Sequence, residues 1–219
     1  MKLKHFAATA LIALALVTSP ASFASIVGTS NLNNFLAVEA FIFPTTFWRA
    51  QSFTVASDQD YLLSDVQMIN RNADSSTFLR IYADNASTPG ALLEQLSFSS
   101  ALPTTIFAAN GTPISAQLLT FSSSGLSLTA SSTYWIVAGR TSGVGSWFGT
   151  TSTTETGLPG WAIGNSFRTS SDAGASWTVP ASYALYTTIN VNPQNVPEPS
   201  ILALIGIAGI SLLRRRKMA

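Results

Sequence analysis

Phe78-Leu79-Arg80-Ile81-Tyr82 is the stretch that most directly indicates the fold of this chain. Successive side chains of a β-strand point to opposite faces of its sheet, so Phe78, Arg80 and Tyr82 are expected to share one face. Asp, Asn, Pro and Gly residues follow within the next eight positions, and these residue types favour turns. The stretch therefore predicts a strand that ends in a turn.

Seven other runs share this enrichment in β-branched and aromatic residues. Clusters of Gly, Pro, Asn, Asp and Ser separate them, and signals for helix ends are scarce. Many short strands with polar turns predict an all-β fold, a β-sandwich or jelly roll. The further expected strands are Gln51–Val55, Tyr61–Ile69, Leu92–Phe98, Gln117–Phe121, Thr133–Ala138, Ser146–Gly149 and Ala184–Val191.

Two segments fit this pattern less well. Asn31–Phe43 is compatible with a strand or with a packed loop, and the sequence leaves both open. Gly143–Ser176 is long and rich in Thr, Ser and Gly, so we expect an irregular loop region there. Loops on a rigid scaffold often bind ligands, which makes this segment the expected functional region.

The amino-terminal residues 1–24 have the three parts of a secretory signal peptide, which predicts a helix that signal peptidase removes. Lys2 and Lys4 form the positive part, and residues 6–17 form the apolar part. Small residues precede the expected cleavage site between Ala24 and Ser25. The rest of the chain is therefore expected outside the cytoplasm.

The carboxyl end combines a stiff tetrapeptide, an apolar run and a basic cluster. In Val196-Pro197-Glu198-Pro199, each proline fixes φ and favours an extended residue before it. The thirteen residues 201–213 bear no charge and would make about 20 Å of helix, shorter than the roughly 30 Å hydrocarbon core of a bilayer. Arg214-Arg215-Arg216-Lys217 should remain on the cytoplasmic side of the membrane.

This order of elements resembles the PEP-CTERM sorting signal of exported bacterial proteins. The resemblance implies an exosortase-type membrane transpeptidase as partner, a transient stay in the inner membrane, and delivery to the cell surface or extracellular matrix. It divides the chain into a signal peptide (1–24), a β-sandwich domain (25–192), a linker with the tetrapeptide (193–199), a single membrane helix (200–213) and a basic tail (214–219). A permanent carboxyl-terminal anchor and a buried hydrophobic helix are the alternatives.

The charge of the exported part excludes several classes of function. Of the eleven basic residues in the chain, Lys2, Lys4 and the four tail cations lie outside the domain, which leaves five arginines against nine acidic residues. Because nucleic acids and anionic membranes need clustered cations, neither is an expected partner. His5 is the one histidine and cysteine is absent, so we expect no catalytic triad, no histidine-bound metal and no cofactor.

Several short segments also resemble the choice-of-anchor R domains, a family of exported β-sandwiches. They are Gln51-Ser52-Phe53-Thr54, Tyr61-Leu62-Leu63-Ser64-Asp65-Val66, Arg80-Ile81-Tyr82-Ala83-Asp84, and Leu128 with Tyr134-Trp135-Ile136-Val137. This resemblance spans roughly residues 45–190. It implies a domain with an interchangeable carboxyl-terminal anchor and no catalytic residues.

Three hypotheses for the domain follow. The first is a non-enzymatic cell-envelope or matrix protein. The second is a carbohydrate-binding module that docks in exopolysaccharide through Trp147, Trp161 or Trp177, which neighbour Gly- and Ser-rich turns and are predicted to be exposed; packing under loops is their alternative role. The third is a glycoside hydrolase that uses two carboxyl groups, such as those of Asp65 and Glu94.

Overall fold

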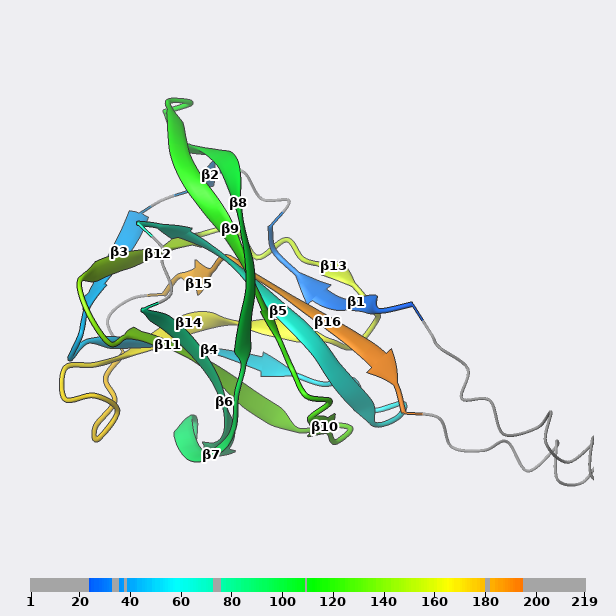
Figure 1. Cartoon of the computed structure of the whole chain (residues 1–219). Coiled ribbons are helices and arrows are strands. Elements are labelled where there is room, and N and C mark those ends of the chain that lie inside the picture. The colour runs from blue at the N-terminus through cyan, green and yellow to red at the C-terminus, as the bar shows by residue number, and fades with distance from the viewer. Residues whose placement is uncertain are drawn as a thin grey trace, which may run out of the picture.

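The computed structural model describes residues 24–32, 36–37, 39–72, 76–108, 110–179 and 182–194. These residues form strands and no helix, and the strands build two sheets (Figure 1). The predicted signal-peptide helix, the predicted membrane helix at 200–213 and the basic tail lie outside the described residues. Within the described ranges, no helix is long and apolar enough to cross a bilayer.

Sixteen strands follow one another along the described chain. They are β1 (Ile26–Ser30), β2 (Leu36–Ala37), β3 (Glu39–Pro44), β4 (Trp48–Thr54), β5 (Tyr61–Arg71), β6 (Thr77–Asn85), β7 (Thr88–Gln95), β8 (Ser97–Ala108), β9 (Pro113–Ser122), β10 (Ser127–Leu128), β11 (Thr133–Arg140), β12 (Val144–Thr150), β13 (Thr156–Gly157), β14 (Ala162–Ser170), β15 (Ala184–Leu185) and β16 (Thr187–Pro193).

The two sheets differ in size. The smaller is antiparallel, in the order β14-β4-β11-β6-β7. The larger runs β13-β1-β16-β5-β9-β8-β2, and the long strand β5 also pairs with β10 near its start and with β12 near its end. This arrangement confirms the predicted all-β class and is consistent with a β-sandwich.

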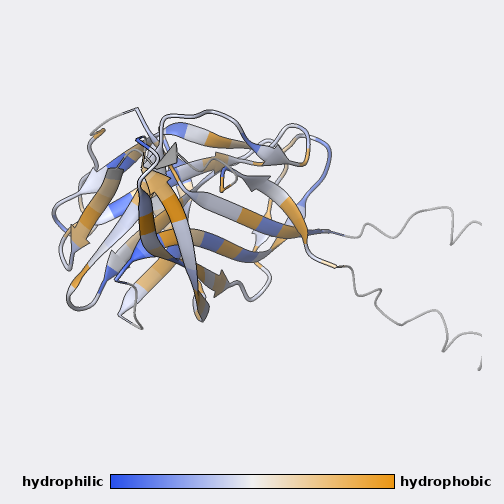
Figure 2. Ribbon diagram, turned by 90° about the horizontal axis from the view of Figure 1, so that it is seen from above, coloured by the Kyte–Doolittle hydropathy of each residue, from blue (hydrophilic) through white to orange (hydrophobic). Residues whose placement is uncertain are grey.

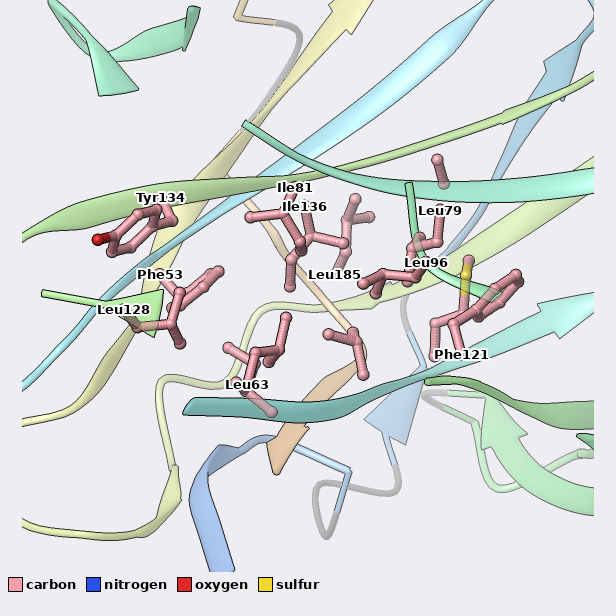
Figure 3. Packing of buried hydrophobic residues seen from close by; sticks show 14 of the residues in the cluster. Phe53, Leu63, Leu79, Ile81, Leu96, Phe121, Leu128, Tyr134, Ile136 and Leu185 are labelled. Atoms are coloured by element: carbon pink, nitrogen blue, oxygen red, sulfur yellow. The ribbon is translucent and has the colours of Figure 1, made fainter. Parts of the chain in front are cut away.

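The space between the sheets is filled by one apolar core. Figure 3 shows side chains of the smaller sheet meeting those of the larger sheet. The smaller sheet contributes Phe53, Leu79, Ile81, Tyr134 and Ile136, and the larger sheet contributes Leu63, Phe121, Leu128 and Leu185. Burial of such side chains away from water supplies the main stabilisation of the fold, because the chain has no cysteine for disulfides.

Strand β6 confirms the alternation predicted from its sequence. Leu79 and Ile81 are fully buried in the core, whereas Phe78, Arg80 and Tyr82 are half-buried on the opposite face. Similar alternation of apolar and polar residues follows other strands in Figure 2. The outer face of the smaller sheet therefore has aromatic and charged residues of its own.

The prediction of one continuous strand over Leu92–Phe98 was wrong, because two strands share this segment. The chain leaves the smaller sheet after Gln95 and enters the larger sheet at Ser97. Leu96, between them, is buried in the core and its amide donates to the carbonyl oxygen of Leu79 at 2.9 Å. Because Leu96 is apolar and fills the core at the corner between β7 and β8, the sequence from Leu92 to Phe98 resembles one strand. The predicted strand Ala184–Val191 is similarly interrupted at Tyr186, which separates β15 from β16.

The prediction of one irregular loop over Gly143–Ser176 was also wrong. The segment contains β12, β13 and β14, and β14 is an edge strand of the smaller sheet. Glycines in β12 leave room for neighbouring side chains: a Cβ at Gly149 would lie 2.8 Å from the Phe41 ring. The ambiguous Asn31–Phe43 segment includes β2 and most of β3.

The first and last strands of the sandwich end side by side. Ile26 at the start of β1 pairs with Val191 near the end of β16, so both strands open to the same end of the molecule (Figure 1). The amide of Gln194 donates to the carbonyl oxygen of Asp60 at 3.1 Å, and its side chain accepts from Ser127 at 3.2 Å. The folded domain therefore holds the chain in place up to Gln194.

Candidate functional site

Trp147 and Trp161 are buried, which corrects the prediction that they are exposed sugar-stacking residues. They are 0% and 7% exposed, respectively. Trp147 donates its indole N–H to the carbonyl oxygen of Tyr186 at 2.8 Å. Trp161 lies nearly parallel to Phe53, with ring centroids 6.3 Å apart. Gly28 of β1 makes space for the Trp161 ring, since a Cβ at this glycine would lie 3.1 Å from it.

Trp177 is half-buried and belongs to a different environment. It packs over the outer face of the smaller sheet, against a cluster formed by Ala50, Trp135 and Val137. Trp135 is buried in this outer cluster and not between the sheets. We call this surface the aromatic face; its residues are Trp48, Phe78, Arg80, Tyr82, Trp135, Arg168 and Trp177.

The strand register assembles the aromatic face from four neighbouring strands. Trp135 of β11 lies between Ser52 of β4 and Tyr82 of β6. Farther along β11, Gly139 pairs with Phe78, and a Cβ at this glycine would overlap the Phe78 ring.

Gly139 therefore allows Phe78 to approach Trp48 in an edge-to-face contact. The two ring centroids are 5.2 Å apart and the rings are inclined by 79°. Aromatic pairs prefer such tilted arrangements, because the positive edge of one ring meets the negative face of the other.

Two arginines lie across these rings. The guanidinium of Arg80 is 4.3 Å from the centroid of Phe78 and 5.3 Å from that of Trp48. The guanidinium of Arg168 is 5.5 Å from the centroid of Trp135. A cation over an aromatic face is stabilised by the ring quadrupole. The rings therefore hold both guanidinium groups against the sheet.

The indole N–H of Trp135 is also fixed. It donates to the Asp84 carboxylate at 2.7 Å, and the same carboxylate accepts from the Ser87 amide at 3.3 Å. Asp84 thus ties the turn after β6 to the middle of the aromatic face.

A hydrogen-bonded loop places Trp177 over the face. The Asp172 carboxylate accepts from the hydroxyl groups of Ser170 and Ser176, both at 2.6 Å, and from the Ser176 amide at 2.9 Å. These donors stabilise the charged form, and the Ser170 hydroxyl has the largest effect. They lower the pKa of Asp172 from 3.8 to about 2.

Acid is therefore expected to loosen this loop. Because the pKa of Asp172 is lower in the folded chain than in the unfolded chain, its contribution to stability is complete well above pH 3.8 and disappears as the pH falls towards about 2. The NMR signal of the Trp177 indole N–H should stay constant from about pH 7 to pH 5 and shift below about pH 3. Asp172→Asn should produce a similar shift at neutral pH, whereas Glu94→Gln, far from this loop, should not. An unchanged Trp177 signal in Asp172→Asn would contradict the role of the carboxylate.

Seven of the carboxylates in the described part of the chain accept hydrogen bonds of this kind. Asp65 of β5 accepts from Asn190, and Glu94 of β7 accepts from Ser123 and Ser124, so the two acids named for a hydrolase lie on different sheets. The other acceptors are Asp58, Asp60, Asp84, Glu155 and Asp172. Among the described residues, no three His, Cys, Asp or Glu side chains form a group that could hold a metal ion.

A polar hollow of about 530 Å³ occupies the outer side of the larger sheet. Its lining includes Ser30, Gln67, Thr188 and Asn190 from three adjacent strands. Ser30 and Thr188 share a hydrogen bond between their hydroxyl groups. The hollow contains no aromatic side chain and no arginine, so the aromatic face is the more distinctive surface.

The residues of the two expected processing sites lie at the limits of the described chain. Ala24 and Ser25 are exposed just before β1. The tetrapeptide Val196-Pro197-Glu198-Pro199 and the cluster Arg214-Arg215-Arg216-Lys217 lie outside the described residues.

The fold defines the described part of the chain as an all-β module of two sheets. Its last strand, β16, is paired with β5. The family model described as the PEP-CTERM protein-sorting motif matches residues 195–217, which begin directly after Gln194. The chain is therefore an exported protein that passes through the membrane and is sorted by exosortase. No curated protein matches the chain.

Proposed function

We propose that the protein is a non-enzymatic component of the cell surface or extracellular matrix. Signal peptidase cuts between Ala24 and Ser25, and the apolar segment 200–213 holds the exported chain in the inner membrane. Exosortase then cuts near the tetrapeptide Val196–Pro199 and passes the β-sandwich to its destination.

One observation supports this proposal above the others: the sorting motif begins at residue 195, shortly after the last described strand, β16, ends at Pro193. Gln194 is the last described residue and is hydrogen-bonded to the domain, while the matched motif begins at residue 195. The hydrogen bonds to Glu94, Asp172 and Asp65 give these carboxylates structural roles. Such roles support a domain that acts as a structural component of the surface or matrix and not as an enzyme.

Intact mass and cell fractionation test the proposal together. Mass spectrometry of the protein from its host should give a chain that begins at Ser25 and ends near the tetrapeptide, recovered from the cell surface or the matrix. A chain that retains Arg214–Lys217 and remains in the inner membrane would instead show the permanent anchor. A chain in the cytoplasm that still has residues 1–24 would contradict export itself.

The carbohydrate-binding module is a second candidate, and the aromatic face favours it. Trp177 is half-buried there, so part of its ring is available for stacking on a sugar. Titration with exopolymer from the host should quench tryptophan fluorescence if this face binds it. Trp147 and Trp161 would not contribute, because they are buried in the core.

A further inference from the structure

The exported domain has few positive charges. Some of its arginines hydrogen-bond within the domain, and others lie on its surface. The segment 25–194 contains five arginines and no lysine. Arg140 is 3% exposed and donates to the carbonyl oxygens of Ser142 and Asn72, and Arg49 donates to the carbonyl oxygen of Ile42. Two arginines are thus used inside the domain.

Arg80 and Arg168 lie together on the aromatic face. The register aligns Arg168, Ala50, Val137 and Arg80 in one row across β14, β4, β11 and β6. Three strand spacings separate the two arginines, which corresponds to about 14 Å between their Cα atoms. The remaining arginine, Arg71, lies on the larger sheet with its guanidinium 5.7 Å from the Phe148 ring centroid.

Each guanidinium on the aromatic face is held in place by a hydrogen bond from its Nε atom, and the acceptor is uncharged. The Nε of Arg80 donates to Gln95 at 2.9 Å, and the Nε of Arg168 donates to the carbonyl oxygen of Ser87 at 3.0 Å. Among the described residues, neither arginine forms an ion pair, and the terminal nitrogens of both have no hydrogen-bond acceptor. A guanidinium held by Nε and by a ring retains the planar fork that suits a carboxylate.

We propose that the aromatic face binds an acidic polysaccharide, with Arg80 and Arg168 receiving two uronate carboxylates of one chain. The half-buried rings of Trp177 and Tyr82 on the same face offer apolar surfaces to the sugar rings of this chain. This inference depends on the proposed function, since only an exported surface or matrix protein meets such a polymer.

The small number of cations on this face favours this polymer over a nucleic acid. Duplex DNA has one charge per about 1.7 Å of its axis and binds to dense stripes of cations. A polyuronate has at most one carboxylate for each sugar, so two arginines on one face can match it without further cations. The acidic domain, with nine carboxyl groups in the segment 25–194, repels the denser polymer more strongly.

The probe for the test is polygalacturonate, and its methyl-esterified form is the control, because esterification removes the charges and keeps the sugar backbone. The processed protein should bind the first polymer and not the second, and added salt should weaken binding because it screens the charges. Arg80→Ala and Arg168→Ala should each weaken binding roughly tenfold, as expected for one lost charge-assisted hydrogen-bond pair.

Arg71→Ala is the matched variant, because it removes the same charge from an arginine over a ring on the other sheet. It should leave the affinity unchanged. Arg80→Lys and Arg168→Lys keep the charge and lose the fork, so they should bind with intermediate affinity if the protein is folded by circular dichroism.

Equal loss of affinity in Arg71→Ala would overturn the proposal, as would equal binding of the esterified polymer or tighter binding of single-stranded DNA. Normal cutting and surface delivery without polygalacturonate binding would refute this inference alone. A chain that remains uncut in the membrane would refute the proposed function, whatever it binds.

Discussion

Replacing both Pro197 and Pro199 with alanine is expected to leave most of the protein uncut in the inner membrane, with its basic end still attached. The two prolines fix φ and favour extended residues at Val196 and Glu198, and a protease cleft accepts an extended strip most readily. Alanine at both positions favours helix instead, so the helix expected for the apolar segment 200–213 would extend backwards through the recognition strip. Immunoblots of membrane fractions would show the larger form.

Pro193→Ala is the matched control for this double variant. Pro193 is the last residue of β16 and pairs with Tyr61, but it precedes the matched motif. Exosortase should therefore process the Pro193→Ala variant at the normal rate. Release of the double variant at normal rate and mass would show that the strip is not what exosortase recognises. Glu198→Gln tests the acidic residue between the two prolines in the same assay. The longer, membrane-held form is again expected.

Trp147→Ala is expected to lower the free energy of unfolding by about 3–5 kcal/mol, a large share of the stability of a domain this size. The indole is fully buried in the core, so its removal leaves a cavity and also leaves the carbonyl oxygen of Tyr186 without its donor. Urea unfolding of the processed protein, followed by circular dichroism, measures this change.

Trp177→Ala is the control, since Trp177 is half-buried on the aromatic face. Its loss should cost about 1–2 kcal/mol. Trp147→Phe keeps most of the apolar volume and loses the N–H, so about 1–3 kcal/mol is expected. If Trp147→Ala left stability unchanged and reduced binding of exopolymer, the residue would be the sugar contact that its neighbouring glycines suggested.

The sequence predicted the fold class and the tail because both depend on local patterns. Alternation along β6 places Leu79 and Ile81 in the core without reference to any other strand. The tail is recognised by the order of its own elements, and the match to the sorting motif at residues 195–217 confirms that prediction.

The details that the sequence did not predict depend on partners far along the chain. Trp147 is buried because β12 pairs with β3 and with the end of β5, and nothing near Trp147 indicates those partners. Leu96 marks the corner between the sheets only when Leu79 is known to lie beside it. Likewise, the aromatic face needs the register of four strands before Arg80 and Arg168 fall into one row.

The hydrogen bonds of Gln194 determine which end of the domain would face a surface to which exosortase joined the protein. Five residues span at most about 18 Å, so a surface joined near Pro199 lies close to the end of the sandwich where β5 begins. The turn between β8 and β9 lies beyond the opposite end of β5, and it would point into the surroundings (Figure 1).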